Sequence, residues 1–437
     1  MAALVRLIVL LAALAQTAAC FSGAIVGREM LADPAMRFQK TSPLAPHHLL
    51  RAEPDRPPAP ASVESYLNLS AEPGADTRGL YFEQLTRAAV ELGAGFGLEA
   101  GYGTQTLQET IMKLDGFSGP FRRELVLHGP DAAVLIDDGS NLLRAGYRLR
   151  LSPEGNLHQA SLRGRSTLLA QDMLLELGYR YSWQEINIER ERLPAAGPVD
   201  ATRSEDFISC ALEKGWLPAW ALRLEVELER QQGFLQSPWR LVSLWSPRGQ
   251  DASALVPASF PENHPPQRFL WAGAIRLHRG LASGRTVLEL GGGAGSDSWR
   301  VEHQHLQAAW RQRLGDFLLE LSAGGYHQTR AYFYRNDYTG PAPGAWWSAD
   351  RNLAAQWGWW ATAGGNWTHF ASRGRLLGMF KYVTLEGGFV FLQLLYATGG
   401  LDDPNAFSGW DSAAGGSRRA FAGGQSLGGW MRFEGGF

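Results

Sequence analysis

Strict alternation of apolar and polar residues recurs along this chain. The clearest run is Leu222-Arg223-Leu224-Glu225-Val226-Glu227-Leu228-Glu229, in which every second residue is apolar and every intervening one is charged. Side chains on a β-strand point alternately to opposite faces, so the run predicts a strand with one apolar and one ionic face. Such strands, when repeated, are typical of a half-solvated antiparallel sheet or of a barrel with lipid outside and water inside.

Other segments show the same period. Residues 144–151 alternate arginine or glycine with apolar residues, and a turn-forming Ser-Pro-Glu-Gly-Asn run follows at 152–156. Residues 175–184 alternate apolar or aromatic residues with polar ones or glycine, and residues 317–322 do so less regularly. At about 10 residues per membrane strand, the region 79–437 accommodates about 14 to 18 antiparallel strands. We therefore predict an all-β fold, an antiparallel transmembrane β-barrel.

The N-terminus predicts export. Arg6 precedes an apolar run at 7–14, and the small residues Thr17-Ala18-Ala19 lead into Cys20. This order is that of a secretory signal peptide over residues 1–19. The apolar run is too short for a membrane helix, and charged or polar residues interrupt every later one. Only helices and closed barrels satisfy the backbone in lipid, so a membrane-embedded form of this chain must be a barrel.

Cys20 stands where a bacterial lipoprotein carries its acylated cysteine, and it is the predicted lipidation site. Thr17 occupies the position that is usually leucine, so an ordinary cleaved signal peptide is the alternative. Cys210 is the other cysteine of the chain. If Cys20 is acylated, no disulfide framework remains, and Cys210 is expected to behave as a small buried hydrophobe.

Residues 20–78 lack the alternation and are predicted to form an irregular periplasmic segment. They include the proline-dense stretch 53–60, which favours an extended linker. Residues 79–437 are predicted to form the barrel. Its candidate outer loops are the connections rich in Pro, Gly and Asp at 194–206, 246–267, 336–350 and 398–418.

Composition narrows the function classes. The 437 residues carry a formal net charge of −2, which gives no global field for nucleic acid. The 51 glycines and 16 tryptophans suit strands with tight turns and aromatic girdles.

The final strand of the sequence carries apolar residues on one face, namely Leu427, Met431, Phe433 and the terminal Phe437. This pattern resembles the recognition signal of the outer-membrane insertion machinery, with Phe433 and Phe437 as its aromatic positions.

The polar face of the predicted strands would line the lumen, and it carries charges of both signs. Ion pairs that simply fill the interior and a dedicated substrate path are both compatible with such a wall, and no strong ion selectivity follows. The predicted lumen residues are Arg144, Arg148, Arg150, Glu176, Arg180, Arg223, Glu225, Glu227, Glu229 and Arg276.

One run suggests a different function. Residues 287–295 read Val-Leu-Glu-Leu-Gly-Gly-Gly-Ala-Gly and resemble the first motif of class I methyltransferases, where a strand enters a glycine loop that cradles S-adenosylmethionine. That function requires a helix after the loop, and residues 302–314 are compatible with one. The surrounding strand patterns and the export signal favour the alternative, a strand followed by a glycine-rich turn.

Histidines and catalytic motifs add little. His303 and His305 would share one face of a strand, but zinc needs three or four converging ligands, so no metal site is predicted. No nucleophile elbow, HExxH motif or special pair of carboxylates is present, and we expect neither an enzyme nor a cofactor.

Two stretches resemble known families. Pro265 to Phe333 resembles an uncharacterised family of Gram-negative outer-membrane proteins, through an Asp-Ser-Trp element at 297–299 followed by histidine, Tyr326-His327-Gln328, and Ala331 with Phe333-Tyr334. In place of the family's Asp before Phe-Tyr stands Tyr332, and its double-tyrosine strand is here Gly291-Gly292-Gly293. Residues 27–36 resemble the segment after the lipidated cysteine of small periplasmic lipoproteins that look like partners of this barrel family.

The resemblance implies a lipoprotein head joined to a barrel in the Gram-negative outer membrane. The expected function is a pore, an export conduit or a structural partner for periplasmic proteins. The expected partners are outer-membrane lipid, the barrel insertion machinery and a periplasmic protein, but not nucleic acid. The alternatives are a soluble S-adenosylmethionine-dependent methyltransferase and an exported β-rich adhesin or hydrolase.

Overall fold

The computed structural model describes residues 61–436 apart from 74–77, 94, 112–120, 139, 169–172, 189–198, 218, 237–240, 249–250, 282–284, 335–337, 340–343, 349–352, 371–379 and 397–421. The predicted signal peptide, Cys20, the lipoprotein-like stretch 27–36 and Phe437 lie outside these residues.

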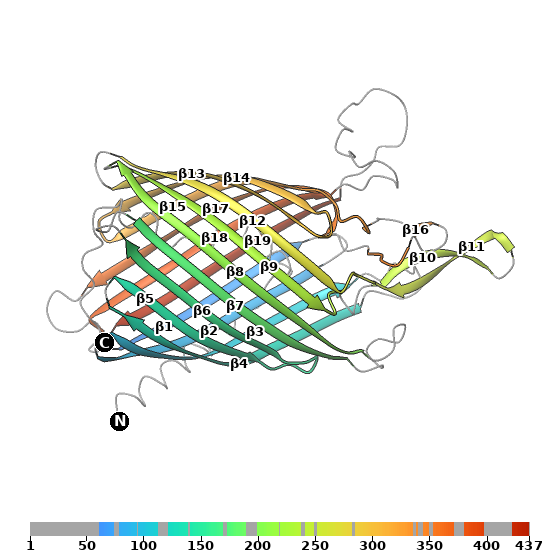
Figure 1. Ribbon diagram of the computed structural model, residues 1–437, viewed down its shortest axis with the longest axis horizontal. Coiled ribbons are helices and arrows are strands. Elements are labelled where there is room, and N and C mark those ends of the chain that lie inside the picture. The colour runs from blue at the N-terminus through green and yellow to red at the C-terminus, as the bar shows by residue number, and fades with distance from the viewer. Residues whose placement is uncertain are drawn as a thin grey trace, which may run out of the picture.

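Sixteen strands of the described chain close into one barrel, which confirms the predicted fold class (Figure 1). Neighbouring barrel strands are antiparallel, and β1 pairs with β19 to close the sheet. A smaller sheet has the order β11-β10-β16. The barrel strands are β1 (Ala61–Pro73), β2 (Arg78–Gly93), β3 (Phe96–Ile111), β4 (Phe121–Asp137), β5 (Asn141–Arg150), β6 (Leu157–Leu168), β7 (Met173–Ile188), β8 (Val199–Leu217), β9 (Trp220–Gly233), β12 (Gln267–Gly280), β13 (Thr286–Asp297), β14 (Glu302–Leu314), β15 (Phe317–Gln328), β17 (Gln356–Phe370), β18 (Tyr382–Tyr396) and β19 (Ala422–Gly436). The small sheet comprises β10 (Leu241–Arg248), β11 (Asp251–Pro261) and β16 (Tyr338–Thr339).

The alternation in the sequence separates an apolar outer face from a charged inner face. On β9, Leu224 and Val226 are 44% and 50% exposed, whereas Arg223 and Glu225, which alternate with them, are 2% and 5% exposed. Ile275 of β12 lies opposite Leu224 in the sheet register and is also exposed. Because facing residues in neighbouring strands share a face, the apolar surface continues around the outside of the barrel.

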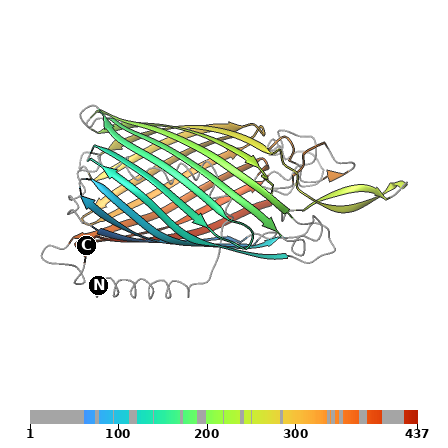
Figure 2. The ribbon, with the colours of Figure 1, turned by 60° about the horizontal axis from the view of Figure 1, so that its bottom comes forward.

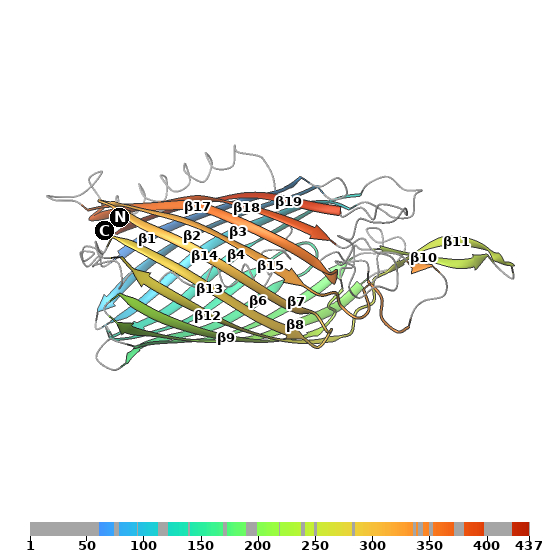
Figure 3. The same ribbon diagram turned by 90° about the horizontal axis from the view of Figure 1, so that it is seen from above.

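The two ends of the barrel differ. β1 begins and β19 ends at the same end, which we call the terminal end, while the connections at the opposite, distal end include the small sheet. Figure 2 shows the β10–β11 hairpin projecting beyond the barrel at the distal end, and Figure 3 shows that it extends along the long axis. Within the described residues, no helix has the length and apolar character needed to cross a membrane.

Three predicted boundaries were wrong. The barrel begins at Ala61 rather than at residue 79, because β1 pairs along its length with both β2 and β19. Polar residues at many positions of β1 hide its period in the sequence. The connection predicted at 194–206 also ends earlier, since β8 begins at Val199, and most of the connection predicted at 246–267 is strand.

Cys210 was wrongly predicted to be buried. It is a free, exposed cysteine on the outer face of β8, opposite Leu177 of β7 and Val226 of β9, which are both exposed. Its apolar character suits the outer surface of the barrel rather than a protein core.

Candidate lumen site

The structure places all ten predicted lumen residues on the inner face of the barrel. They come from β5, β7, β9 and β12, and their strand neighbours such as Tyr147, Tyr179 and Leu224 are exposed on the outer face. Phe433 lies on β19 with its ring centroid 5.8 Å from that of Phe380.

Arg223 lies at the centre of a buried ion-pair network. Its guanidinium is 2.6 Å from the Glu176 carboxylate on β7, 2.6 Å from Glu225 on its own strand and 3.6 Å from Glu213 on β8. Glu225 also pairs with Arg276 of β12 at 2.9 Å. Arg223, Arg276 and Glu213 are at most 2% exposed. Because a buried charge is costly unless it is paired, these groups depend on one another.

A second network surrounds Glu289 of β13. Its carboxylate accepts hydrogen bonds from Arg311 at 2.7 Å and from Gln307 at 2.9 Å, both on β14. His278 Nδ1 of β12 lies 3.5 Å from the same carboxylate, and Arg311 pairs with Glu320 of β15 at 3.1 Å. Together the two networks link β7–β9 and β12–β15. We call the inner face of β9 and β12–β15 the packed wall.

A glycine stripe on β13 makes room for this packing. Gly291, Gly293 and Gly295 fall on its inner face, because Leu288 and Leu290 are exposed outside. A Cβ added to Gly293 would lie 2.5 Å from His305 Cε1, and one added to Gly295 would lie 2.6 Å from His303 Cε1. Side chains of β14 therefore lie directly over the backbone of β13.

The stripe overturns the methyltransferase hypothesis. Residues 287–295 lie within β13, so they form neither a cofactor loop nor the predicted glycine-rich turn, and residues 302–314, which were compatible with a helix, form β14. No strand–loop–helix unit exists in this part of the chain. Glycine is used here for close side-chain approach rather than for a phosphate cradle.

His303 and His305 share the inner face of β14, as their spacing predicts, and both are buried. Over the described residues, no group of three or more His, Cys, Asp and Glu side chains is placed to hold a metal ion.

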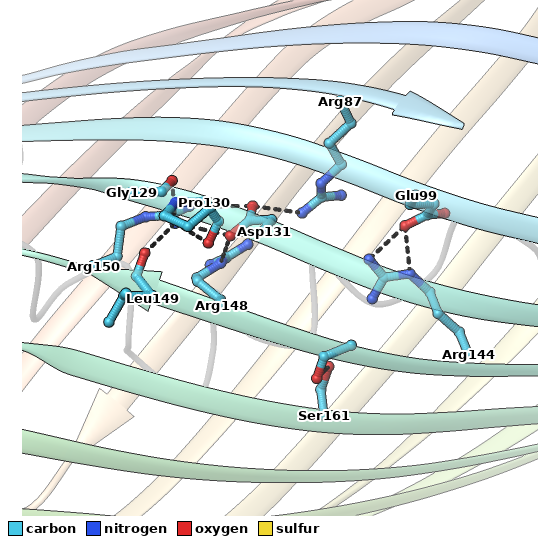
Figure 4. A network of polar contacts seen from close by, with 11 residues as sticks. Arg87, Glu99, Gly129, Pro130, Asp131, Arg144, Arg148, Leu149, Arg150 and Ser161 are labelled. Carbon is cyan, nitrogen blue, oxygen red and sulfur yellow. Dashed lines mark hydrogen bonds and ion pairs between the residues drawn. The ribbon is translucent and has the colours of Figure 1, made fainter. Parts of the chain in front are cut away.

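The inner face of β2–β6, which we call the open wall, carries a different arrangement. Arg150 is 2% exposed and holds Asp131 of β4 at 2.8 Å and 3.2 Å through its two terminal nitrogens (Figure 4). Arg150 Nη1 also donates to the backbone oxygens of Leu149 at 2.9 Å and Gly129 at 3.0 Å. Pro130 lacks an N–H, so the arginine supplies donors where the strand ladder is interrupted.

Further arginines of the open wall face the lumen. Arg148 lies 3.1 Å and Arg87 of β2 lies 3.8 Å from the same Asp131, and Arg144 donates to Glu99 of β3 at 2.9 Å and 2.6 Å. Figure 4 shows these side chains and the ion pairs that join them. Arg87, Arg144 and Arg148 keep 25–28% of their side-chain surface exposed, in contrast to the arginines of the packed wall.

An aromatic cluster covers the packed wall at the distal end. Asp297 organises the β13–β14 turn: its carboxylate accepts the backbone N–H groups of Trp299 at 2.8 Å and Val301 at 2.9 Å. Arg268 donates to the other oxygen at 2.7 Å and stacks 4.5 Å from the Trp299 ring. Arg300 in this turn has a φ of 66°, which the Asp297 hydrogen bonds hold in place.

The residues that carry the family resemblance meet in this cluster. Trp299 packs with the buried side chains Val301, Tyr326, Ala331, Phe333, Tyr334, Leu353, Ala354 and Trp360. Gln328, another resemblance residue, donates to the Ala354 carbonyl at 3.2 Å. These residues therefore pack together at the distal mouth of the barrel.

Sequence reasoning missed the acidic partners and part of the second network. Asp131 and Glu99 were not singled out, nor were Glu289, Arg311 and Glu213. Asp131 is the single charged residue in the run 129–136, and an isolated charge in an apolar strand was the signal available. The others required the pairing between strands, which the sequence does not display.

Comparison with known proteins finds a family match for part of the chain. Residues 217–360 match the family described as "Protein of unknown function (DUF3570)". This region includes β9, β12–β15, both centres of the packed wall and the aromatic cluster, and it contains the stretch Pro265 to Phe333. No curated protein matches the sequence.

Solved structures with a similar fold are outer-membrane proteins. A bacterial polysaccharide outer membrane secretin has a TM-score of 0.43 and 9% identity over 85% of this chain and 97% of its own. The toluene transporter TodX of Pseudomonas putida has a TM-score of 0.40 and 9% identity over 95% of each chain. OmpT, an outer membrane protein of Vibrio cholerae, has a TM-score of 0.38 and 7% identity over 86% and 98%. At these values no function is carried over.

Proposed function

We propose that this chain is a pore or conduit in the outer membrane of a Gram-negative bacterium. The observation that carries the proposal is the closed barrel with an apolar outer face and a charged inner face. A closed sheet pairs its backbone groups internally, which is what hydrocarbon demands, and charged inner walls suit a hydrated lumen.

The proposal assigns partners to separate surfaces. Lipid surrounds the outer face, and the barrel insertion machinery reads the final strand with Phe433 and Phe437. A lipid anchor at Cys20 and a periplasmic protein at the terminal end complete the arrangement. Export and structural support for that protein are roles of the same barrel.

The first experiment is cell fractionation, followed by gel migration of boiled and unboiled samples in detergent. A folded barrel in the outer-membrane fraction should migrate differently before and after boiling. Single-channel recording of the purified protein in a planar bilayer then tests conduction. A soluble protein without a heat-dependent shift, or a folded barrel that never conducts, contradicts the proposed pore.

A further inference from the structure

The geometry points to a binding site for small oxyanions, carboxylates or phosphates, on the open wall beside Gly146 of β5. The inference rests on the proposed function in one respect: the site faces the path that solutes would take. It goes beyond that function by naming the chemistry of the solute.

The floor of the site is a row of small residues. Ala133 of β4 and Ser161 of β6 flank Gly146 in the sheet register. The Ser161 hydroxyl lies 3.4 Å from the Gly146 carbonyl oxygen, and a Cβ at Gly146 would lie 3.1 Å from Arg144 Nη1. The floor therefore carries only short side chains, and Arg144 leans across Gly146.

Arginines border the floor on both sides along the strands. Arg148 lies two residues beyond Gly146 and Arg144 two residues before it, so at about 3.3 Å per residue their Cα atoms are about 13 Å apart. Arg163 of β6 is directly opposite Arg144 in register. Like charges at facing positions repel, so an anion between them would be favoured.

The carboxylates present do not balance these cations. Both Asp131 oxygens are engaged by Arg150, so Arg148 shares an anion that is already paired. Glu99 is engaged by Arg144. On the inner face of β3–β6, the described side chains set five guanidiniums against three carboxylates. These are Arg144, Arg148, Arg150, Arg163 and Arg165 against Glu99, Asp131 and Asp137.

Arg163 is the strongest single indication. It is exposed on the inner face of β6, and within the described part of the chain it has no ion-pair or hydrogen-bond partner. The planar guanidinium donates two parallel N–H groups to a carboxylate or phosphate, which a chloride ion cannot accept in the same way. A site built from arginines therefore favours oxyanions over halide.

Isothermal titration calorimetry of the full-length barrel in detergent tests the site. Inorganic phosphate and succinate are titrated separately against a constant chloride background. We expect at least one of them to bind, and the double variant Arg148→Gln/Arg163→Gln to weaken that binding at least about tenfold. The two titrations distinguish a phosphate site from a carboxylate site.

The matched control is Arg279→Gln, which removes a cation that stacks on Trp220 on the outer face of β12, 5.0 Å from the ring centroid. It should bind like the wild type. Arg163→Lys keeps the positive charge but loses the planar guanidinium with its two parallel N–H donors. This variant should bind the anion more weakly than the wild type. Heat-dependent migration confirms that each variant is folded. Absence of binding by both anions, or wild-type binding by the double variant, overturns the inference.

The binding assay does not require conduction. A barrel that conducts but binds neither anion refutes the site and leaves the pore intact. A barrel that binds but never conducts refutes the pore and leaves the site intact.

Discussion

The two walls of the lumen use the same residue type in opposite ways. On the open wall of β2–β6, Arg150 is buried, but Arg87, Arg144 and Arg148 keep about a quarter of their surface in the lumen. On the packed wall of β9 and β12–β15, Arg223 and Arg276 are almost completely buried in ion pairs. In the strand order of the barrel, these two walls lie on opposite sides.

The difference arises from what surrounds each arginine. Arg223 of the packed wall is paired with Glu225 on its own strand and with Glu176 and Glu213 on the adjoining strands β7 and β8. The open wall supplies one carboxylate, Asp131, to three guanidiniums. The number of arginines along each strand does not distinguish the walls. The number of carboxylates that neighbouring strands place beside each guanidinium decides whether an arginine is structural or available for a ligand.

Breaking the packed wall should have the largest effect. Arg223→Met leaves Glu176, Glu213 and Glu225 without their shared cation, and we expect it to lower the free energy of unfolding by about 3–5 kcal/mol. Arg148→Met on the open wall removes a partly exposed cation and should cost less than about 1 kcal/mol. Urea unfolding followed by loss of the heat-dependent gel shift measures both. Equal costs would contradict the distinction between the walls.

The second-largest expected effect tests which residues point to the outer face of the barrel and which point to the inner face. Leu224→Arg places a charge on the apolar outer face of β9 and should cost about 2–4 kcal/mol near the membrane midplane. Ser209→Arg points inward on β8, opposite Glu227, and should assemble normally. The yield of folded barrel in the outer-membrane fraction compares them. If both arginines are tolerated, the assignment of outer and inner faces is wrong.

A smaller effect concerns the glycines that allow dense packing. In Gly293→Ala the new Cβ would lie 2.5 Å from His305 and 2.6 Å from the Gly273 carbonyl oxygen, and we expect a cost of about 1–3 kcal/mol. In Gly146→Ala on the open wall, the nearest atoms are the flexible ends of Arg144 and Ser161, so the cost should stay below about 1 kcal/mol. Midpoints of the heat-dependent shift give the ranking, and the reverse order would refute the packing argument.

The smallest expected change in stability concerns a residue outside both walls, Asp138 in the turn between β4 and β5. The pKa of Asp138 is held below its usual 3.8 by hydrogen bonds from the Asn141 side chain and from the backbone N–H groups of Asn141 and Ser140. A lowered pKa in the folded state means that the stabilisation is full above pH 3.8 and is lost as pH falls through the folded value. Asp138→Ala should therefore melt slightly earlier than wild type at pH 7, with the difference shrinking below pH 3.8. A difference that is constant with pH would contradict the role of the carboxylate.

The sequence allowed much of the barrel to be predicted where strands are strictly amphipathic. Leu222 to Glu229 and Arg144 to Arg150 have the faces that their period predicts. β1 was missed because its apolar positions are interrupted, and its pairing with β19 is what makes it a strand. Strand formation there depends on distant partners rather than on local pattern.

The candidate site was only half predictable for the same reason. The inward-facing arginines of β5 follow from the alternation. The excess of guanidiniums over carboxylates depends also on Asp131 of β4 and Arg163 of β6, which lie beside β5 only in the folded sheet. The glycines at 291, 293 and 295 were read as a turn-rich segment because glycine usually marks turns. Their role in admitting His303 and His305 is visible only once β14 lies beside β13.

The seam between β1 and β19 determines when the barrel can be completed. Val63 pairs with Gly435, about 370 residues later in the chain, so the register of this seam cannot form until the whole chain is available. Until then both terminal strands present open edges, which are prone to pair with other chains. Closure thus requires both terminal strands, and the kinetic risk of aggregation through open edges falls on the interval before they pair.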